Sequence, residues 1–327
     1  MIRMRLWGSV AGLFCLHLSP LSLSQILGVN VGWSLWKMAE MITSATRLTH
    51  VTLANGVVMP RLGLGTFRAR DEDVRKAVLC ALQCGYTHID TASIYKNEVE
   101  IGETVRASGI ERDKLFITSK VSPYEQGFEK ATQAVNNILD RLGFSYLDLC
   151  LIHWPGAAKL DTKSNKNSKL RSETWRALEQ FYKQGKCRAI GVSNYTEKHL
   201  DELISSCEIK PMVNQVEVHP WLAQPQLRTV CNQHGVVVQA YSPLGVGSLL
   251  RDSSVQTVAS NCKRSPAQVL LRWGIQNDLV VLPKSVHEEY IVENQDIFSF
   301  SLSGEDMASL NSLDRGHHFC WSAEDVC

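Results

Sequence analysis

The chain has 327 residues, a formal net charge of +1 at pH 7, 44% hydrophobic residues and 20% charged residues. This is the composition of an ordinary soluble globular protein, and the small net charge argues against nucleic acid or a strongly charged surface as a partner. The length fits two domains or one large α/β barrel, which typically needs about 250 residues.

Residues 1–45 differ in composition from the rest of the chain. Residues 1–5 are basic and residues 6–18 are almost wholly apolar, as in the first two regions of a secretory signal. No clean small-residue cleavage site follows, and the apolar run is too short to span a membrane. A disordered extension and a true start at Met38 or Met41 are the alternatives. We therefore expect a barrel domain over residues 46–327, cytoplasmic unless residues 1–40 act as a targeting segment.

The ten cysteines are scattered along the chain, with no CxxC pair and no Cys/His metal spacing. We expect no metal site and a reducing compartment.

Residues 51–59 are expected to form a β-hairpin. Asn55-Gly56 separates two alternating runs, and this dipeptide favours a type I′ turn because both central residues of that turn need positive φ.

Strand-like and helix-like segments then alternate without a break. The eight predicted strands cover residues 62–67, 87–90, 115–121, 147–154, 187–194, 213–218, 236–241 and 279–285. The helical patterns cover residues 71–84, 97–108, 128–142, 172–184, 196–207, 224–234, 255–275 and 287–297. An extra helix is expected over 304–313, and the tail from 314 to 327 has no clear structure.

Short apolar strands separated by helices favour parallel pairing with both faces of the sheet covered. Eight such units without a linker predict a closed (β/α)8 barrel, with the hairpin capping its bottom. Gly63 and Gly65 lack the third glycine of a GxGxxG fingerprint, so no Rossmann dinucleotide domain is expected.

Titratable side chains stand at three consecutive predicted strand ends. Asp90 ends the second strand, Lys120 the third and His153 the fourth, and Tyr95 follows Asp90 closely. Alone, each has an ordinary explanation: a helix cap, a solvated lysine, a satisfied core histidine, a surface phenol. Together they are hard to explain by packing, because inward-facing Lys and Asp are costly unless paired. Chemistry in such a barrel gathers at this end.

These four side chains suit the reduction of a carbonyl group, which needs a hydride at carbon and a proton at oxygen. A phenol with an ordinary pKa of about 10 is a weak acid for that purpose. We expect Lys120 to lower the pKa of Tyr95, and Asp90 to hold Lys120 charged and in place. His153 is expected to hydrogen-bond and polarise the substrate oxygen.

The sequence strongly resembles the aldo-keto reductases, from about residue 48 to at least residue 294. Asp90, Tyr95, Lys120 and His153 match the family's Asp, Tyr, Lys and His on a (β/α)8 barrel. The other matching segments are LGLGTF at 62–67, GVSN at 191–194, VNQVE at 213–217, AYSPLG at 240–245 and LPKSV at 282–286.

The resemblance implies a nicotinamide cofactor bound without a Rossmann domain. It places Ser193, Asn194 and Gln215 on the carboxamide and Tyr241 against the nicotinamide ring, although Tyr241 also fits a simple rim aromatic. It places Ser242 and Leu244 on the pyrophosphate. The other cofactor-binding positions expected from the resemblance are Gly65, Thr66, Lys284, Ser285, Val286, Tyr290, Glu293 and Asn294.

One departure from the family concerns the adenosine end. Lys284 and Ser285 match the contacts to the 2′-phosphate, where positive charge favours NADPH. Tyr290, however, stands where the family has an arginine, and Glu288 and Glu289 add negative charge nearby. We expect a weakened preference for NADPH, with NADH possible.

Large aromatic residues suggest the substrate pocket. Phe67, Trp154 and Trp221 are the candidates around the mouth, with Trp321 on the tail as a fourth. The Lys-, Asn- and Ser-rich loop over 156–170 is expected to be mobile and solvated.

The short tail favours an open site for small aldehydes, dicarbonyls or similar ketones, and His153 weighs against reduction of carbon–carbon double bonds. The expected partner is this small carbonyl substrate, with no nucleic acid, no membrane for the barrel and a monomeric state. The alternative is a cofactor-binding regulatory or sensor subunit with little turnover, as in the potassium-channel β subunits that resemble these enzymes.

Overall fold

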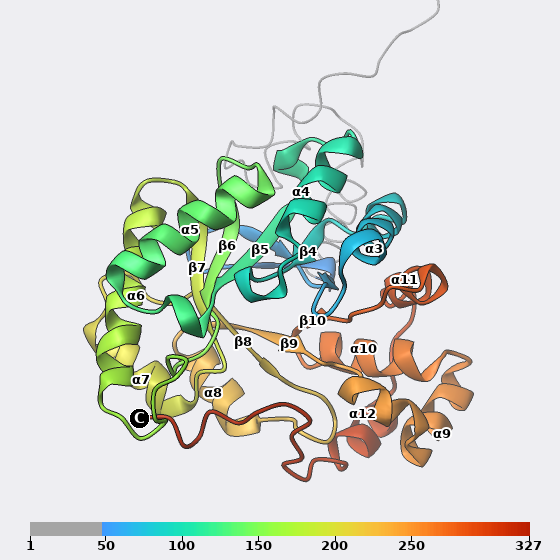
Figure 1. The fold of residues 1–327 in the computed structure, drawn as a ribbon. Helices are drawn as coiled ribbons and strands as arrows, with labels where there is room; N and C mark the ends of the chain where they lie inside the picture. Colours follow the sequence, from blue (N-terminus) through green and yellow to red (C-terminus); the bar gives the residue numbers. More distant parts are fainter. Residues whose placement is uncertain (1–47) are drawn as a thin grey trace, which may run out of the picture. The chain divides into compact units, whose positions relative to one another are not determined.

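Eight parallel strands form a barrel in the computed structural model, which describes residues 48–327 (Figure 1). The expectations for residues 1–45 lie outside the described residues. The strands are β3 (Leu64–Gly65), β4 (His88–Asp90), β5 (Phe116–Val121), β6 (Leu147–Ile152), β7 (Cys187–Ser193), β8 (Val213–Glu217), β9 (Val237–Tyr241) and β10 (Val280–Leu282). They pair in chain order, and parallel bridges Leu62–Val281 and Gly65–Lys284 join the first strand to the last. The predicted (β/α)8 barrel is confirmed.

Helices follow the strands around the outside of the barrel, as Figure 1 shows. They are α3 (Asp71–Gln83), α4 (Glu98–Ala107), α5 (Phe128–Leu142), α6 (Lys166–Lys183), α7 (Glu197–Ser206), α8 (Pro225–Gln233), α9 (Ser253–Cys262), α10 (Pro266–Gln276), α11 (Glu288–Gln295) and the extra α12 (Gly304–Asn311). No helix within residues 48–327 has the length and apolar character needed to cross a membrane.

Helix α5 shows why the sequence pattern specifies this architecture. Its buried positions, including Ala131, Val135, Ile138 and Leu142, recur at the three- and four-residue spacing of one helical face. Gly143 ends the helix with φ of +67°, a left-handed conformation that glycine adopts without steric cost. The strand that follows, β6, is buried at every position, as expected for a parallel strand covered on both faces.

The hairpin is present, but its turn is not type I′. Strands β1 (His50–Thr52) and β2 (Val58–Pro60) pair antiparallel with Thr52 opposite Val58, which leaves a five-residue loop. Of the Asn55-Gly56 pair, Gly56 has positive φ, at +85°. The Asn55 side chain instead accepts from Val57 N at 3.2 Å and donates to Arg188 O at 2.8 Å. Its amide ties the loop to the barrel at Arg188 of β7.

The hairpin closes the bottom of the barrel, as expected. Met59 of β2 is fully buried and packs in an apolar cluster that includes the first residues of β5, β8 and β10. The cluster, which we call the floor, consists of Leu53, Met59, Phe116, Leu149, Leu151, Ala189, Met212, Val213, Val280 and Leu282.

Two predicted helix boundaries are wrong. The segment 255–275 is two helices, because Lys263 adopts φ of +52° and Ser265 then caps α10, with Pro266 in its first turn. Helix α6 begins at Lys166, inside the loop expected to be solvated to residue 170. Asn167 there is fully buried, and its amide donates to Asp161 O at 2.9 Å and Thr162 O at 3.1 Å.

The tail over residues 314–327 has no helix or strand, as expected, but it is firmly attached. Phe319 N and Cys320 N donate to the carboxylate of Glu217 at 2.9 and 3.1 Å. Near its end, Cys327 N donates to Thr162 O at 2.8 Å. The tail therefore runs over the carboxyl-terminal ends of the strands as a fixed strap.

Candidate active site

The four titratable residues come together at the carboxyl-terminal end of the barrel. Asp90 ends β4, Lys120 is the fifth residue of β5, and His153 directly follows β6. Tyr95 ends a short 3-10 helix, Ser93–Tyr95, that follows β4. Because neighbouring strands pair in parallel, these ends meet on one face.

Lys120 connects the group. Its ammonium Nζ lies 2.6 Å from Asp90 Oδ1, 2.9 Å from Thr91 O and 3.5 Å from the Tyr95 hydroxyl oxygen. The Lys120 side chain is fully buried and that of Asp90 nearly so. A buried ammonium must be paired, and Asp90 supplies the opposite charge.

The pKa of Tyr95 is raised above its ordinary value, although Lys120 lowers it as the sequence predicted. Burial of the phenol raises the pKa most, and the Lys120 ammonium lowers it by less. Asp90 raises it further, because its negative charge opposes that of a tyrosinate. The pKa of Lys120 is raised too, since attraction to Asp90 and Tyr95 outweighs the effect of burial. Tyr95 is therefore a protonated phenol beside a charged lysine at neutral pH.

His153 is held as a neutral imidazole. Burial first, and then the charge of Lys120, put its pKa well below the ordinary value. Its backbone N donates to Val121 O at 3.0 Å, and its carbonyl accepts from Asn194 Nδ2 at 3.0 Å. Its ring lies edge-on to that of Tyr95, with centroids 5.6 Å apart. The buried Nδ1 has no hydrogen-bond partner among the described residues.

The residues expected around a carboxamide form one connected group. Ser193 Oγ donates to Gln215 O at 2.8 Å, and Tyr241 donates its phenol hydrogen to Asn194 Oδ1 at 2.8 Å. Gln215 Nε2 donates to Asp90 Oδ2 at 2.8 Å. The group therefore reaches the Asp90–Lys120 pair through Gln215.

The first strand contributes close packing at this end. Gly65 N donates to Pro283 O at 2.9 Å, and a Cβ at Gly65 would lie 3.2 Å from Leu282 O. Thr66 is buried and its hydroxyl donates to Asp90 O at 2.8 Å.

The residues expected at the pyrophosphate and adenosine lie in the loops that follow β9 and β10 and on α11. Ser242 adopts φ of +49°, and Leu244 and Val286 are half-buried. Lys284 is exposed and Ser285 Oγ accepts from His287 N at 3.0 Å.

Helix α11 carries the other three expected adenosine contacts. Tyr290 is 52% exposed and lies edge-on to His287, with ring centroids 5.5 Å apart. Glu293 is bonded to the Ser265 hydroxyl that caps α10, and Asn294 is buried with its Oδ1 unpaired among the described residues. Tyr290 is thus open to a ligand, whereas Glu293 is engaged within the protein.

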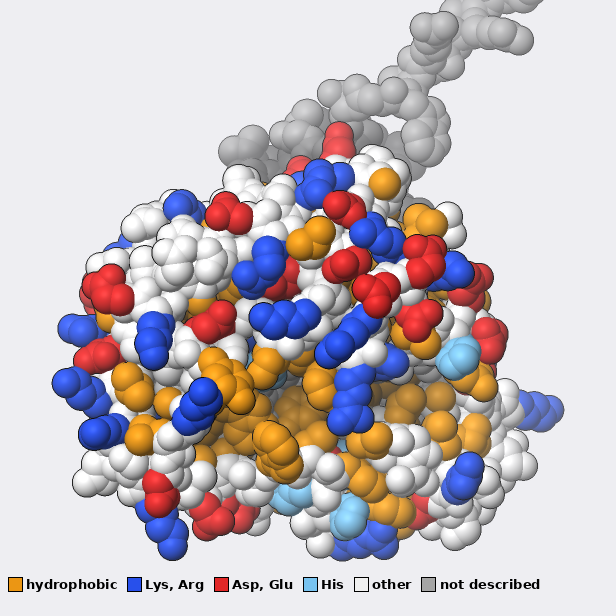
Figure 2. All heavy atoms as spheres, viewed as in Figure 1, with side chains coloured by type: hydrophobic (Ala, Val, Ile, Leu, Met, Phe, Trp, Pro, Cys, Tyr) orange, Lys and Arg blue, Asp and Glu red, His pale blue; other side chains and the backbone are white. Residues whose placement is uncertain are grey.

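Two of the aromatic candidates lie beside the tetrad. The Phe67 ring is 52% exposed, with its centroid 5.1 Å from that of Tyr95. Trp154 follows His153 and its ring lies 6.4 Å from that of Trp321, which is 84% exposed. Figure 2 shows a hollow lined by hydrophobic side chains on the face drawn there, with basic side chains along its edge.

Trp221, in contrast, lies beneath the tail. Phe319 stacks on its ring at 5.8 Å and the Arg315 guanidinium lies 3.5 Å from its centroid. Its ring is thus covered by residues of the tail.

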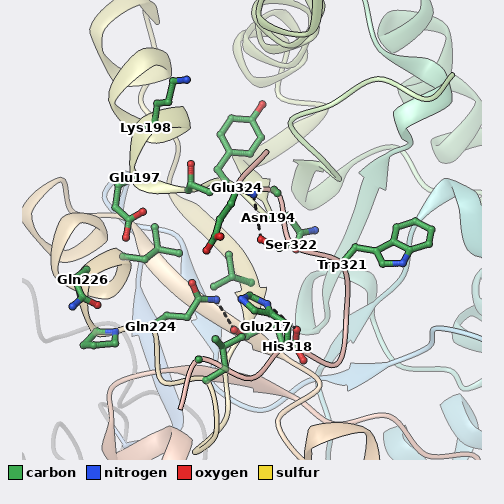
Figure 3. Close-up of a pocket in the computed structure, with 18 of the residues that line it drawn as sticks. Asn194, Glu197, Lys198, Glu217, Gln224, Gln226, His318, Trp321, Ser322 and Glu324 are labelled. Carbon is green, nitrogen blue, oxygen red and sulfur yellow. Dashed lines mark hydrogen bonds and ion pairs between the residues drawn. The ribbon is translucent and has the colours of Figure 1, made fainter. Parts of the chain in front are cut away.

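Sequence reasoning missed the contribution of Glu217, which anchors the tail. Its place at the end of β8, in the VNQVE segment, was the available signal, but its partners lie a hundred residues away. A cavity of about 730 Å³ opens beside it, between the starts of α7 and α8 and the tail. Figure 3 shows Glu197 and Lys198, Gln224 and Gln226, and Trp321, Ser322 and Glu324 around this cavity.

No group of three His, Cys, Asp or Glu side chains within residues 48–327 is arranged to hold a metal ion.

Comparisons with known proteins point to one family. The model of the Aldo/keto reductase family matches residues 61–315. The chain is 47% identical over 266 residues to a glyoxal reductase of Bacillus subtilis, which covers 81% of this chain and 92% of that protein. It is 41% identical over 280 residues to a morphine 6-dehydrogenase of Pseudomonas putida, covering 81% and 91%.

A solved structure is similarly close. The crystal structure of an aldo-keto reductase enzyme from a Medee basin deep-sea metagenome library aligns with a TM-score of 0.78 and 40% identity. The alignment covers 85% of this chain and 99% of that one. A family model that spans most of the chain, and relatives matched over nearly their whole length, lead to one conclusion: this chain belongs to the aldo/keto reductase family.

Proposed function

We propose that this chain is an NADPH-dependent reductase that converts aldehydes and ketones to alcohols, with Tyr95 as the acid. The observation that carries the proposal is the Lys120 ammonium, which lies within 3.5 Å of both Asp90 and the Tyr95 hydroxyl. A protonated phenol beside a fixed cation can give up its proton at a cost that the cation reduces.

In the proposed reaction, each residue of the tetrad has a separate task. Tyr95 donates its proton to the substrate oxygen, and Lys120 stabilises the tyrosinate that remains. Asp90 keeps Lys120 charged and placed. Neutral His153 donates one ring N–H to the substrate oxygen and polarises the carbonyl. The cofactor, when bound, supplies the hydride to the carbonyl carbon.

The side chains present fit a nicotinamide dinucleotide. No hydrogen bond to Gln215 Oε1 is found among residues 48–327, and this oxygen is not one of the fully enclosed polar atoms. It is therefore available to a carboxamide N–H. Ser193 and Asn194 border the same place, and Tyr241 offers its ring face. Ser242 and Leu244, with Gly65 and Thr66, would border the pyrophosphate.

The proposed preference for NADPH rests on the adenosine end. Exposed Lys284, with Ser285 beside it, supplies a cation and a hydroxyl for a 2′-phosphate. Tyr290 offers an exposed ring for stacking but no charge, and Glu288 and Glu289 are also exposed. The preference should accordingly be weak.

Small aldehydes, dicarbonyls or similar ketones are the proposed substrates. Phe67 and Trp154 give the mouth an aromatic wall, and the strap leaves Trp321 largely exposed. The reductase names of the relatives, glyoxal among them, support a small carbonyl compound. We also propose a monomeric protein in the cytoplasm. The nine unpaired cysteines among the described residues support a reducing compartment.

Steady-state oxidation of NADPH and NADH against methylglyoxal, an aromatic aldehyde, a quinone and a steroid ketone tests the proposal. We expect turnover of methylglyoxal or the aldehyde, with kcat/KM moderately higher for NADPH. Tight NADPH binding without turnover of any of the four would instead favour a sensor subunit. Equal kcat/KM with NADH would overturn the cofactor assignment alone.

A further inference from the structure

Two glutamines lie side by side inside the barrel, next to Asp90 of the tetrad. Gln215 on β8 and Gln239 on β9 face each other in the parallel register. Gln239 is fully buried and Gln215 is 2% exposed. Buried amides must be hydrogen-bonded, so their partners show which way each amide is turned.

The orientation of Gln215 follows from its neighbours. An ionised carboxylate only accepts hydrogen bonds, so the amide nitrogen of Gln215 must face Asp90 Oδ2, at 2.8 Å. The second hydrogen on that nitrogen goes to Gln239 Oε1 at 2.9 Å. Gln239 Nε2 in turn donates to Met59 Sδ of the hairpin at 3.1 Å. Turning the Gln239 amide over would set two donors against each other.

Both N–H groups of Gln215 are thus directed into the protein, and its Oε1 is left as an acceptor. A single bond to Asp90 would let the amide plane pivot about that contact. Two bonds from the same nitrogen fix the plane. The hydrogen bond to Gln239 therefore fixes the position of Gln215 Oε1.

We propose that Gln239 is a positioning residue for the cofactor: it holds Gln215 so that Gln215 Oε1 is presented to the amide N–H of the nicotinamide carboxamide. The inference rests on the proposed function and adds to it a residue that does not itself touch the cofactor. It also links the site to Met59, which belongs to the floor.

The test compares two ligands that differ at the carboxamide. NADP+ carries an amide N–H donor, and its 3-acetylpyridine analogue has a methyl group instead. Dissociation constants of both are measured by quenching of protein fluorescence, for the wild type, Gln215→Met, Gln239→Met and Gln239→Leu. Met59→Leu is the matched control, because it changes the same cluster and keeps the Gln239 oxygen. Thermal unfolding confirms that each variant folds.

We expect the wild type to bind NADP+ about fivefold more tightly than the analogue, the effect of one hydrogen bond. The ratio should fall close to one in Gln215→Met and in both Gln239 variants, and stay at the wild-type value in Met59→Leu. A full wild-type ratio in both folded Gln239 variants overturns the inference, as does a wild-type ratio of one. A wild type that binds neither dinucleotide overturns the proposed function itself.

Discussion

The two ends of the barrel are filled in opposite ways. The floor is an apolar cluster, in which Met59, Leu149 and Val280 are fully buried and the hairpin seals the strands from below. At the other end, which we call the rim, Asp90, Lys120 and Gln215 are just as deeply buried but polar. Burying a charged or polar group costs free energy unless a partner offsets it, whereas burying apolar surface is favourable.

The two ends of the barrel therefore contribute different properties to the protein. Rim groups are not all satisfied within the protein: His153 Nδ1 has no partner among residues 48–327, and Gln215 Oε1 is left as a free acceptor. In a ligand-binding site such groups have no hydrogen-bond partner within the protein, and this lowers the stability of the folded chain. We infer that the floor supplies stability and the rim supplies chemistry. Substitutions at the floor should therefore lower the free energy of unfolding, and substitutions at the rim should lower turnover.

The largest expected effect is on turnover at the rim. Tyr95→Phe removes the proposed acid and should lower kcat by about 10²- to 10⁴-fold, the usual contribution of a positioned proton donor. Cofactor affinity and thermal stability should change little, since the ring remains. Tyr124→Phe, at an exposed tyrosine, is the matched control. Turnover of Tyr95→Phe within a few-fold of the wild type would mean that another group donates the proton.

At the floor, Met59→Ala should cost about 2–5 kcal/mol of unfolding free energy, as for other large-to-small core changes. It should leave kcat of the protein that remains folded within a few-fold of the wild type. Urea denaturation followed by tryptophan fluorescence measures the first quantity. Met307→Ala, at a half-buried position of α12, should cost clearly less. A fall in the kcat of folded Met59→Ala by much more than a few-fold would contradict the division between the two ends.

The sequence predicted the floor and the rim unequally well. The barrel and its hairpin followed from apolar strands and helical periodicity, which depend on local spacing. The strand ends Asp90 and Lys120 could be found the same way, because parallel strands bring their carboxyl ends together. The net direction of the Tyr95 pKa could not, since it depends on how burial and the Asp90 charge balance Lys120.

Other features depended on contacts distant in sequence. The anchoring of the tail on Glu217 joins residues 102 and 103 positions apart, and no local pattern records it. The break before α10 was different: Ser265-Pro266 was a visible capping signal that the long apolar periodicity concealed.

At the adenosine end of the expected cofactor site, Tyr290→Arg should change cofactor affinity alone. The new guanidinium adds a charge where a 2′-phosphate is expected, and should tighten NADPH binding about tenfold, the usual gain from one charge-assisted hydrogen bond. NADH binding, kcat and stability should stay nearly constant. Fluorescence titration measures both affinities, with Tyr290→Gln as an uncharged control. Equal tightening of NADH would place the 2′-phosphate elsewhere.

The smallest expected effect is that of pH on the chemical step. Burial raises the pKa of Tyr95 above its ordinary value of about 10, so the acid form persists as pH rises towards that value. The pKa of His153 lies well below 6.5, so the imidazole stays neutral as pH falls through that value. The single-turnover rate of reduction should therefore vary less than about twofold between roughly pH 6 and 9.

The two limbs of that profile distinguish the two residues. A rate that falls on the alkaline side with a midpoint near about pH 8 would show that Lys120 depresses the Tyr95 pKa more than burial raises it, as the sequence alone suggested. A fall on the acid side near the ordinary histidine pKa of 6.5 would show that His153 takes up a proton despite the neighbouring Lys120 charge. The His153→Gln variant, which cannot titrate, should lose only that acid limb. Either result would mean that water reaches the rim far more freely than its burial in the structure implies, and the contrast with the floor would weaken accordingly.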